Sequence, residues 1–271
     1  MTPTTDLPTR HSALGLARRV PDRVVRQNGA VPTPTVTATV TPTVTAIVTV
    51  FDRTTYLAEA ITSVLDQTHP VHEVIVVDDG STVDLSPVLA PFGDAIRVVR
   101  QDNRGDAAAR NLGVALATGE VLTFLDDDDV WTPHKVAVQL AALTREPGPV
   151  VVFGHIVQFA SPELAPGLVV VPDDADVPVP GPMNGTLMVT RSTFEAIGPF
   201  PEPMDGTGFV DWYARVLDQE IRTVIVPEVV LRRRHHLGNL GRVNNAPVAY
   251  ARALRRVIER RRGRASEEDA R

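Results

Sequence analysis

The amino-acid sequence predicts an α/β fold, a doubly wound and mostly parallel sheet flanked by helices. From residue 44 onward, short apolar runs rich in β-branched residues alternate with segments whose apolar residues recur at helical spacing. Two of these runs, residues 73–77 and 120–125, end directly in acidic residues. Ligands of such sheets bind outside the carboxyl ends of the strands, so acids at these positions indicate a binding site.

The first half of the chain supplies the regular part of this pattern. Strands are predicted at residues 45–51, 73–77, 96–99 and 120–125. The first helix should bury residues that recur at helical spacing, namely Leu57, Ile61, Val64 and Leu65. A second helix is predicted over residues 106–117, with Leu112 and Leu116 on one face. A third should begin at Pro133 behind an N-cap at Thr132 and bury Val136, Leu140 and Leu143.

The second half is less regular, and its elements are predicted from shorter patterns. Strands are expected at residues 150–159, 186–189, 223–226 and 229–232, and helices at residues 191–197 and 209–219. A loop rich in Pro and Asp should span residues 161–182. We therefore expect one domain over residues 43–245, with a regular half at 43–145 and a less regular half at 146–245.

The two ends of the chain differ in composition from this domain. Residues 1–42 are rich in Thr, Pro and Arg and poor in large apolar residues, which predicts a disordered tail. Residues 246–271 are basic and partly amphipathic, and a C-terminal helix and tail is expected there.

Composition excludes several classes of site. The 271 residues contain no Cys, so a metal must be held by oxygen or imidazole ligands, which favours Mg²⁺ or Mn²⁺. The net charge of -6 gives no sign of a nucleic-acid-binding protein. No apolar run approaches the ~20 residues needed to cross a bilayer, and no secretory signal pattern begins the chain, so we expect a cytoplasmic protein.

Four consecutive aspartates at residues 126–129 are the most informative motif. Adjacent carboxylates repel one another unless water screens them or a cation binds between them. Hard divalent cations take carboxylate oxygens and keep positions open for phosphate oxygens. Asp126 and Asp128 would point to the same face of an extended segment. The alternative is a solvated acidic turn, but the apolar strand before the run and Trp131 after it favour a metal site.

Two further segments are ambiguous when each is taken alone. In residues 74–82 a strand ends in paired acids, and Asp79 either contacts a nucleobase or ribose or forms a simple Asp-Gly turn. In residues 103–111, Gly105 permits close backbone approach and Arg110 could neutralise a diphosphate; the alternative is a capped helix with a solvated arginine.

Together these segments resemble the GT-A glycosyltransferases of family 2. The motifs, in the order of the family, are TVFDR (49–53), SVLDQT (63–68), VDDGS (77–81), NRGDAAARN (103–111) and FLDDDDVW (124–131). The resemblance covers residues 45–140. It implies that residues 43–145 are the nucleotide-sugar-binding half of the domain and residues 146–245 its acceptor-side half. It implies a Rossmann-like GT-A fold and metal-dependent, inverting transfer of a sugar from a nucleotide-diphosphate sugar, most commonly a UDP-sugar. The acceptor hydroxyl could belong to a glycan, lipid, small molecule or peptide.

The resemblance also implies roles for individual residues. Those expected to bind the nucleotide-sugar are Thr49, Asp52, Asp79, Arg110, Asp126, Asp127 and Arg234. Those expected to bind Mn²⁺ or Mg²⁺ are Asp128, Asp126 and His236. Asp52 stands where Asn is more common in the family.

The acceptor-side half resembles the family more loosely. The segment GFVDWYARVL (208–217) is similar to the one that carries the general base, which makes Asp211 the candidate, although Val210 replaces the usual preceding Glu. The alternative is an acid that stabilises a helix N-terminus. VLRRRHHLGNL (230–240) supplies Arg234 and His236, with a basic surface loop as the alternative. Asn184 should lie at the acceptor edge, together with Gly185.

Other protein classes share single features with this chain. A haloacid-dehalogenase-type phosphatase also has Asp-x-Asp after a strand, but on its first strand and with a more distant Lys than Lys135, the only lysine here. A phosphoacceptor receiver domain needs a Lys that this chain lacks. A sugar nucleotidyltransferase would have a Gly-rich basic signature at the first strand. A non-catalytic nucleotide-sugar-binding protein stays open if Asp211 is not the base.

Overall fold

A computed structural model describes residues 41–162, 175–202 and 207–238. The tail expected over residues 1–42, except its last two residues, and the C-terminal helix expected over 246–271 lie outside the described residues. Residues 163–174, which make up most of the loop expected over 161–182, also lie outside the described residues.

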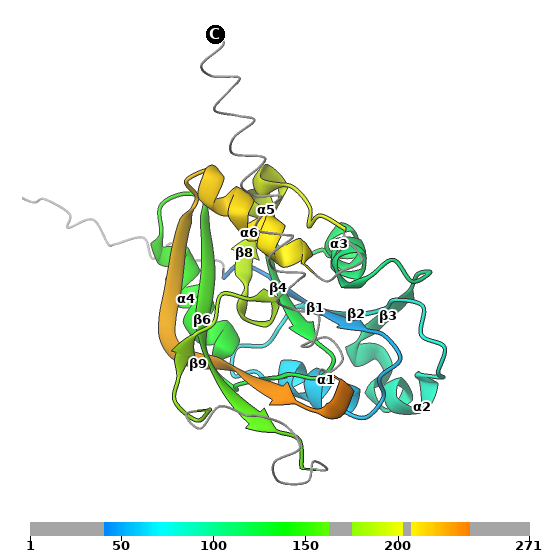
Figure 1. Cartoon of the computed structure of the whole chain (residues 1–271). Helices are drawn as coiled ribbons and strands as arrows, with labels where there is room; N and C mark the ends of the chain where they lie inside the picture. The colour runs from blue at the N-terminus through cyan, green and yellow to red at the C-terminus, as the bar shows by residue number, and fades with distance from the viewer. Residues whose placement is uncertain (1–40, 163–174, 203–206, 239–271) are drawn as a thin grey trace, which may run out of the picture. The chain divides into compact units, whose positions relative to one another are not determined.

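Within the described residues, nine strands form one curved sheet (Figure 1). The strands are β1 (Val44–Val50), β2 (Glu73–Asp78), β3 (Arg97–Arg100), β4 (Val121–Asp126), β5 (Val130–Trp131), β6 (Val150–Ala160), β7 (Val179–Pro180), β8 (Met188–Thr190) and β9 (Arg222–His235). Their order in the sheet is β3-β2-β1-β4-β8-β6-β9-β5, and β7 pairs with β6. The predicted α/β fold is confirmed.

The first four strands are parallel, as predicted, because each is followed by a helix that returns the chain to the amino edge. The second half makes the sheet mixed. Strand β8 is antiparallel to both β4 and β6, and β5 is antiparallel to β9. Strand β9 is parallel to β6.

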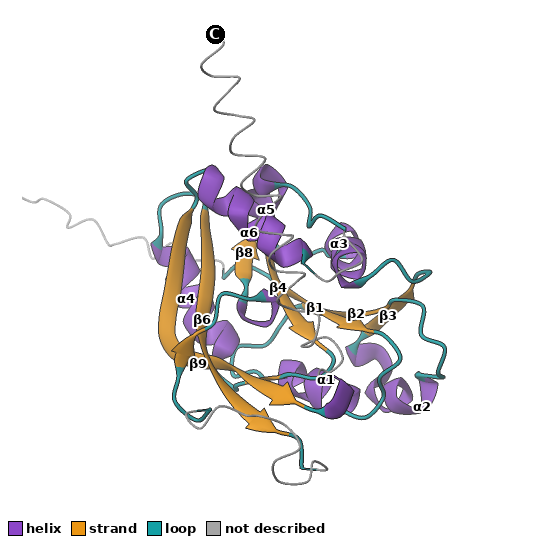
Figure 2. Cartoon of the chain, in the orientation of Figure 1, coloured by secondary structure: helices purple, strands orange, loops and turns teal. Residues whose placement is uncertain are grey.

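Helices cover both faces of the sheet (Figure 2). They are α1 (Leu57–Leu65), α2 (Ser86–Leu89), α3 (Asp106–Leu116), α4 (Lys135–Arg145), α5 (Arg191–Ile197) and α6 (Gly208–Asp218), with 3₁₀ turns η1 (Ala90–Ala95) and η2 (Asn184–Thr186). One apolar core joins α1, α2 and α4 to one face of the sheet, and a second joins α3, α5 and α6 to the other. Burial of these two faces is the main stabilising contribution.

Two local predictions are corrected, the start of α4 and the division of β9. Helix α4 begins at Lys135 and not at Pro133; its N-cap position is His134, no side chain caps it, and the hydroxyl of Thr132 donates to the carbonyl of Val229 at 2.7 Å. Helix α3 agrees with the prediction: Leu112 and Leu116 both pack, partly buried, against the same core, and the helix also buries its alanines, with Gly113 against Ile47 of β1.

The two strands expected at 223–226 and 229–232 are one strand, β9, of 14 residues. Pro227 lies within it, at a point where the pairing with β6 shifts register between Gly154 and His155. A proline cannot donate a ladder hydrogen bond, and the shift leaves Pro227 without a paired position, so the strand continues past it.

Parallel pairing brings the acidic ends of the strands together. Thr49 of β1 is level with Asp126 of β4, and Val50 is level with Asp78 of β2. The carboxyl ends of three neighbouring strands therefore meet at one edge, which is where the sequence predicts the binding site. No helix in the described parts of the chain is long and apolar enough to span a membrane.

Candidate functional site

The four aspartates form the turn between β4 and β5. Asp126 is the last residue of β4, and the other three lead into β5. Asp126, Asp128 and Asp129 each offer a carboxylate oxygen, and these three atoms lie within 4.8 Å of one another. This set of hard oxygen donors fits Mg²⁺ or Mn²⁺. The sequence analysis chose Asp126 and Asp128 as metal ligands and missed Asp129. In an extended segment, side chains of adjacent residues point to opposite faces, so Asp129 was expected to point away from Asp128.

The electrostatics of this turn are those of crowded, buried acids. Burial raises the pKa of Asp127 to about 8, the Arg53 guanidinium opposes that rise, and Asp128 and Asp126 add to it. Burial also raises the pKa of Asp129 well above its ordinary value, helped by Asp128 and Asp126. Asp128 differs: burial raises its pKa, but His236 and Arg53 together lower it below the ordinary value. A bound cation would relieve the mutual repulsion of these groups.

Arg53 is a member of this site that sequence reasoning did not assign. It follows β1 by three residues, and its guanidinium forms ion pairs with Asp127 and, at 2.7 Å, with Asp128. The only available signal was its place in the TVFDR motif at the carboxyl end of β1. Its contact with an acid 75 positions later depends on the parallel pairing of β1 with β4.

Arg110 approaches the turn from helix α3. Its side chain is 4% exposed and pairs with Asp126 at 2.5 Å and with Asp106, one turn earlier in the helix, at 2.9 Å. Burial by itself lowers the pKa of Arg110, but the two carboxylates raise it by more than that. The net pKa lies above the ordinary value, so the guanidinium is charged. With its amide oxygen turned toward Arg110, Asn184 accepts from Nη1 at 3.1 Å and Nη2 at 3.2 Å.

The end of β9 closes another side of the turn. The backbone N–H of Arg234 donates to Asp129 at 2.9 Å, and its Nε donates to the carbonyl of Asp128 at 2.9 Å. The same guanidinium pairs with Glu59 and lies 4.4 Å from the ring of Tyr56. Arg234 therefore holds the acidic turn in place, and its predicted contact with the nucleotide-sugar stays a prediction.

His236 lies beside Asp128, with Nε2 at 3.0 Å from Oδ2. Its Nδ1 accepts from the backbone N–H of Gly238 at 3.0 Å, so the proton of the neutral ring is on Nε2 and points at Asp128. His236 is not one of the three side chains whose ligand atoms cluster within 4.8 Å. The structure thus shows it orienting a candidate metal ligand, and direct metal coordination by His236 stays a prediction.

The residues predicted to bind the nucleotide lie at the ends of β1 and β2. The carboxylate of Asp79 accepts from Gln101 at 2.7 Å and from the backbone N–H groups of Arg104 and Gly105 at 2.9 and 2.8 Å. It therefore fixes the loop that leads into α3. Thr49 is buried on β1, level with Val77 of β2 and Asp126 of β4. Contact of Asp79 or Thr49 with a nucleotide stays a prediction.

Asp52 has a backbone φ of 51°, which is uncommon for a residue other than glycine. The conformation is held because its N–H donates to Ser81 Oγ at 3.0 Å and its carboxylate accepts from the N–H and hydroxyl of Thr82. Partial desolvation raises the pKa of Asp52, but the hydrogen bonds that its carboxylate accepts from Thr82 and Val83 lower the pKa below its ordinary value. The exposed carboxylate thus joins the end of β1 to the turn after β2.

Asp211, the candidate base, is buried in the first turn of α6. One helical turn earlier, Gly208 packs so closely on α3 that a Cβ there would lie 3.0 Å from the Cβ of Ala107. Residues three apart share a helix face, so Asp211 lies on the side of α6 that faces the start of α3. Arg110 is one turn along α3 from that contact. This packing is compatible with the predicted role, which no further observation tests.

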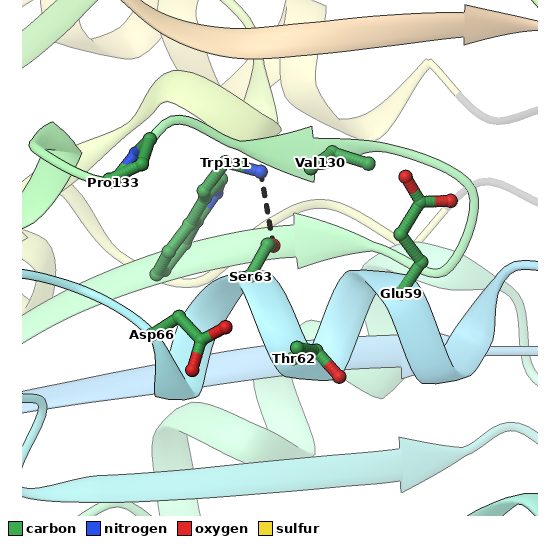
Figure 3. A pocket seen from close by; sticks show the side chains of 7 residues that line it. All are labelled: Glu59, Thr62, Ser63, Asp66, Val130, Trp131 and Pro133. Atoms are coloured by element: carbon green, nitrogen blue, oxygen red, sulfur yellow. Dashed lines mark hydrogen bonds between the residues drawn. The ribbon is translucent and has the colours of Figure 1, made fainter.

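A surface groove of about 220 Å³ lies between α1 and β5, the strand that follows the acidic turn (Figure 3). Its lining residues are Glu59, Thr62, Ser63, Asp66, Val130, Trp131 and Pro133. The N–H of Trp131 donates to Ser63 Oγ at 3.1 Å, and the indole Nε1 donates to the carbonyl of Gly185 at 3.1 Å. Trp131 thereby links α1 to η2, the turn that presents Asn184 to Arg110. The groove does not include the carboxylates of the acidic turn.

The raised pKa of Asp127 predicts that stability decreases with pH. Between about pH 4 and pH 8 the folded state holds a proton on this carboxyl that the unfolded state has lost, so the free energy of unfolding falls as pH rises through that range. The slope from one such group is at most about 1.4 kcal/mol per pH unit. Asp127→Asn should reduce it, measured by urea unfolding with EDTA present. The exposed Asp94→Asn is the control, and equal slopes in all three proteins would contradict the prediction.

Comparison with known proteins agrees with this architecture. A family model described as "Glycosyl transferase family 2" matches residues 45–167. An uncharacterized glycosyltransferase of Nostoc sp. is 46% identical over 94 residues, which cover 33% of this chain and 29% of that protein. The putative teichuronic acid biosynthesis glycosyltransferase TuaG of Bacillus subtilis is 40% identical over 89 residues, covering 31% of this chain and 35% of TuaG. This chain thus spans about a third or less of the length of these relatives.

A solved structure shows the same fold. The crystal structure of S. aureus TarS 1-349 superposes with a TM-score of 0.57 at 18% sequence identity, covering 79% of this chain and 64% of that one. The matched residues 45–167 include β1 to β6, the acidic turn and Arg110. Residues 45–167 therefore match glycosyl transferase family 2, and the fold is that of the GT-A glycosyltransferases.

Proposed function

We propose that this protein is a metal-dependent glycosyltransferase that moves a sugar from a nucleotide-diphosphate sugar, a UDP-sugar in the first instance, to an acceptor hydroxyl. The observation that carries the proposal is the acidic turn in a family 2 domain: three carboxylate oxygens within 4.8 Å at the carboxyl end of β4, with Arg110 paired to one of them. This edge of an α/β sheet is where ligands bind.

Each part of the site has a role that suits sugar transfer. A divalent cation held by Asp126 and Asp128, with Asp129 close by, would offset the charge that develops on the diphosphate leaving group. Arg110 is charged, buried and adjacent, so it suits an anionic ligand. Asp79 orders the loop before α3, next to which the nucleoside would lie.

Transfer with inversion needs one base on the face of the sugar opposite the leaving group. Asp211 is our candidate, because α6 packs its first turn against the first turn of α3. In this scheme it accepts the proton of the acceptor hydroxyl as that oxygen attacks the anomeric carbon and the nucleoside diphosphate leaves. The chemical class of the acceptor stays open between glycan, lipid, small molecule and peptide.

The first test is a thermal-shift screen of the full chain against nucleotides and nucleotide-sugars, with Mn²⁺ and with EDTA. A ligand that binds only the folded state raises the apparent melting temperature; at 100 times its Kd the added stability is about 2.7 kcal/mol. We expect a nucleoside diphosphate or its sugar to raise the melting temperature in Mn²⁺ and to do so much less in EDTA. No shift with any nucleotide would overturn the proposal.

Two alternatives make different predictions. A non-catalytic nucleotide-sugar-binding protein would show the thermal shift but neither transfer nor hydrolysis of the donor. A haloacid-dehalogenase-type phosphatase needs a lysine near its acids. Here Lys135 is fully buried, donates to Thr123 Oγ1 at 2.6 Å and lies 4.1 Å from the ring of Trp131. Burial lowers the pKa of Lys135 well below its ordinary value, which further disfavours a charge-balancing role there.

A further inference from the structure

Arg53 occupies the position of a counter-ion in the acidic turn. A single nitrogen, Nη1, contacts both Asp127 Oδ1 and, at 2.7 Å, Asp128 Oδ2. The same Oδ2 of Asp128 lies 3.0 Å from His236 Nε2. One oxygen of the candidate metal ligand is therefore already approached by two basic groups.

The backbone on both sides of Arg53 positions its side chain at the acidic turn. Asp52, the residue before it, has a φ of 51° and is held in that conformation by hydrogen bonds to Ser81 and Thr82. On the outer side, a Cβ at Gly238 would lie 3.9 Å from Arg53 Nη2, so the segment after β9 comes close to the guanidinium. Arg53 thus sits between the end of β4 and the end of β9.

A guanidinium and a divalent cation compete for the same carboxylate charge. If a cation bound Asp128 while Arg53 stayed in place, two positive groups would lie a few ångströms apart and repel each other. Carboxylate lone pairs that accept from Arg53 are also not free to bind a metal. Binding of the cation therefore favours release of Arg53 from Asp128.

Arg53 and Arg110 differ in how firmly they are held. Arg110 is 4% exposed, and Asp106 and Asn184 contact it in addition to Asp126. Arg53 is 19% exposed, and its ion pairs in the described residues both go to the aspartate turn. If the ion pairs with the aspartate turn are lost, Arg110 is still held by Asp106 and Asn184. Arg53 is then free to move toward solvent or toward an anionic ligand.

We propose that Arg53 is a displaceable counter-cation: it pairs with Asp127 and Asp128 in the metal-free protein and leaves Asp128 when a divalent cation binds. Arg53 and the cation compete for the charge of Asp128, so Arg53 sets the metal affinity of the site. Once released, its guanidinium is next to the proposed diphosphate position and can pair with that anion. This inference rests on the proposed metal site.

The test is Mn²⁺ binding to the full chain, measured without donor by electron paramagnetic resonance of the free ion. Arg53→Gln removes the competitor and should tighten Mn²⁺ binding by about tenfold or more. Arg222→Gln is the matched control, because it removes the same charge from an exposed ion pair with Glu146 at the start of β9. The control should bind Mn²⁺ as the wild type does.

Unchanged or weaker Mn²⁺ binding in Arg53→Gln would overturn the inference, since it would mean that Arg53 organises the ligands and does not compete. If that variant fails to fold, the wild type supplies the answer through the arginine Nε–Hε resonances during Mg²⁺ titration. With Arg53→Lys used for assignment, the Arg53 signal should shift as Mg²⁺ binds, and an unshifted signal at saturation overturns the proposal. A wild type that binds neither ion overturns the metal site itself.

Discussion

Asp128→Ala should abolish metal-dependent sugar transfer. Asp128 is one of the three side chains whose oxygens cluster at the end of β4, and its Oδ2 contacts both Arg53 and His236. A metal ion that stabilises the leaving group contributes several kcal/mol to the transition state. At about 1.4 kcal/mol per factor of ten, its loss should lower kcat/KM by about a thousandfold or more. The measurement is release of nucleoside diphosphate from the donor in Mn²⁺.

The substitution also removes two ion pairs, so its effect on folding has to be separated from its effect on catalysis. Asp128→Asn keeps the shape of the side chain and should show the same loss of turnover with a smaller change in stability. Asp94→Ala, an exposed acid in η1, is the control and should be fully active. Wild-type rates in a folded Asp128→Ala protein would exclude the acidic turn as the metal site.

Asp211→Asn should retain donor binding and lose turnover. The substitution keeps the size of the side chain but removes the proton acceptor, and general-base catalysis contributes about 10²- to 10⁴-fold. We therefore expect kcat to fall in that range while the Kd for donor, measured calorimetrically with Mn²⁺, stays within about twofold. The pattern differs from that of Asp128→Ala, in which donor binding in Mn²⁺ should weaken as well.

A matched substitution stands at the other end of the same helix. Asp218→Asn changes the last residue of α6, and Asp211→Asn changes its first turn. If Asp211 serves only to stabilise the helix N-terminus, its replacement should cost about 0.3–1 kcal/mol of stability and leave turnover unchanged. Full activity of Asp211→Asn would therefore assign it that structural role, and the base would have to be sought elsewhere.

In the first half, strands β1 to β4 and helices α1, α3 and α4 could be predicted from local pattern alone, whereas α2 and β5 were not predicted. β-branched apolar runs such as residues 45–51 and 73–77 are typical of strands buried on both faces, and the structure places β1 and β2 there. Strand polarity then located both acidic motifs at one edge, which the parallel register of β1, β2 and β4 confirms.

The second half could not be predicted as well, because its pairing is non-local. Strand β9 continues through Pro227 only because β6 accommodates a register shift, and the sequence reads that proline as the end of a strand. Strand β5 has two residues, and its pairing with β9 places the end of β9 beside the acidic turn. No local pattern marks either feature.

The sequence by itself indicated the resemblance of residues 45–167 to glycosyl transferase family 2, the α/β fold and the location of an acidic site, because these follow from short-range periodicity and from motifs whose order is visible along the chain. Only the tertiary structure decided how charge is arranged at that site. It brought Asp129 into the ligand group, placed Arg53 on Asp127 and Asp128, and turned Arg234 toward the backbone of the turn. The contacts of Arg53 and Arg234 join segments 74 to 106 positions apart, and only the pairing of β1 with β4 and of β5 with β9 brings them within hydrogen-bonding distance.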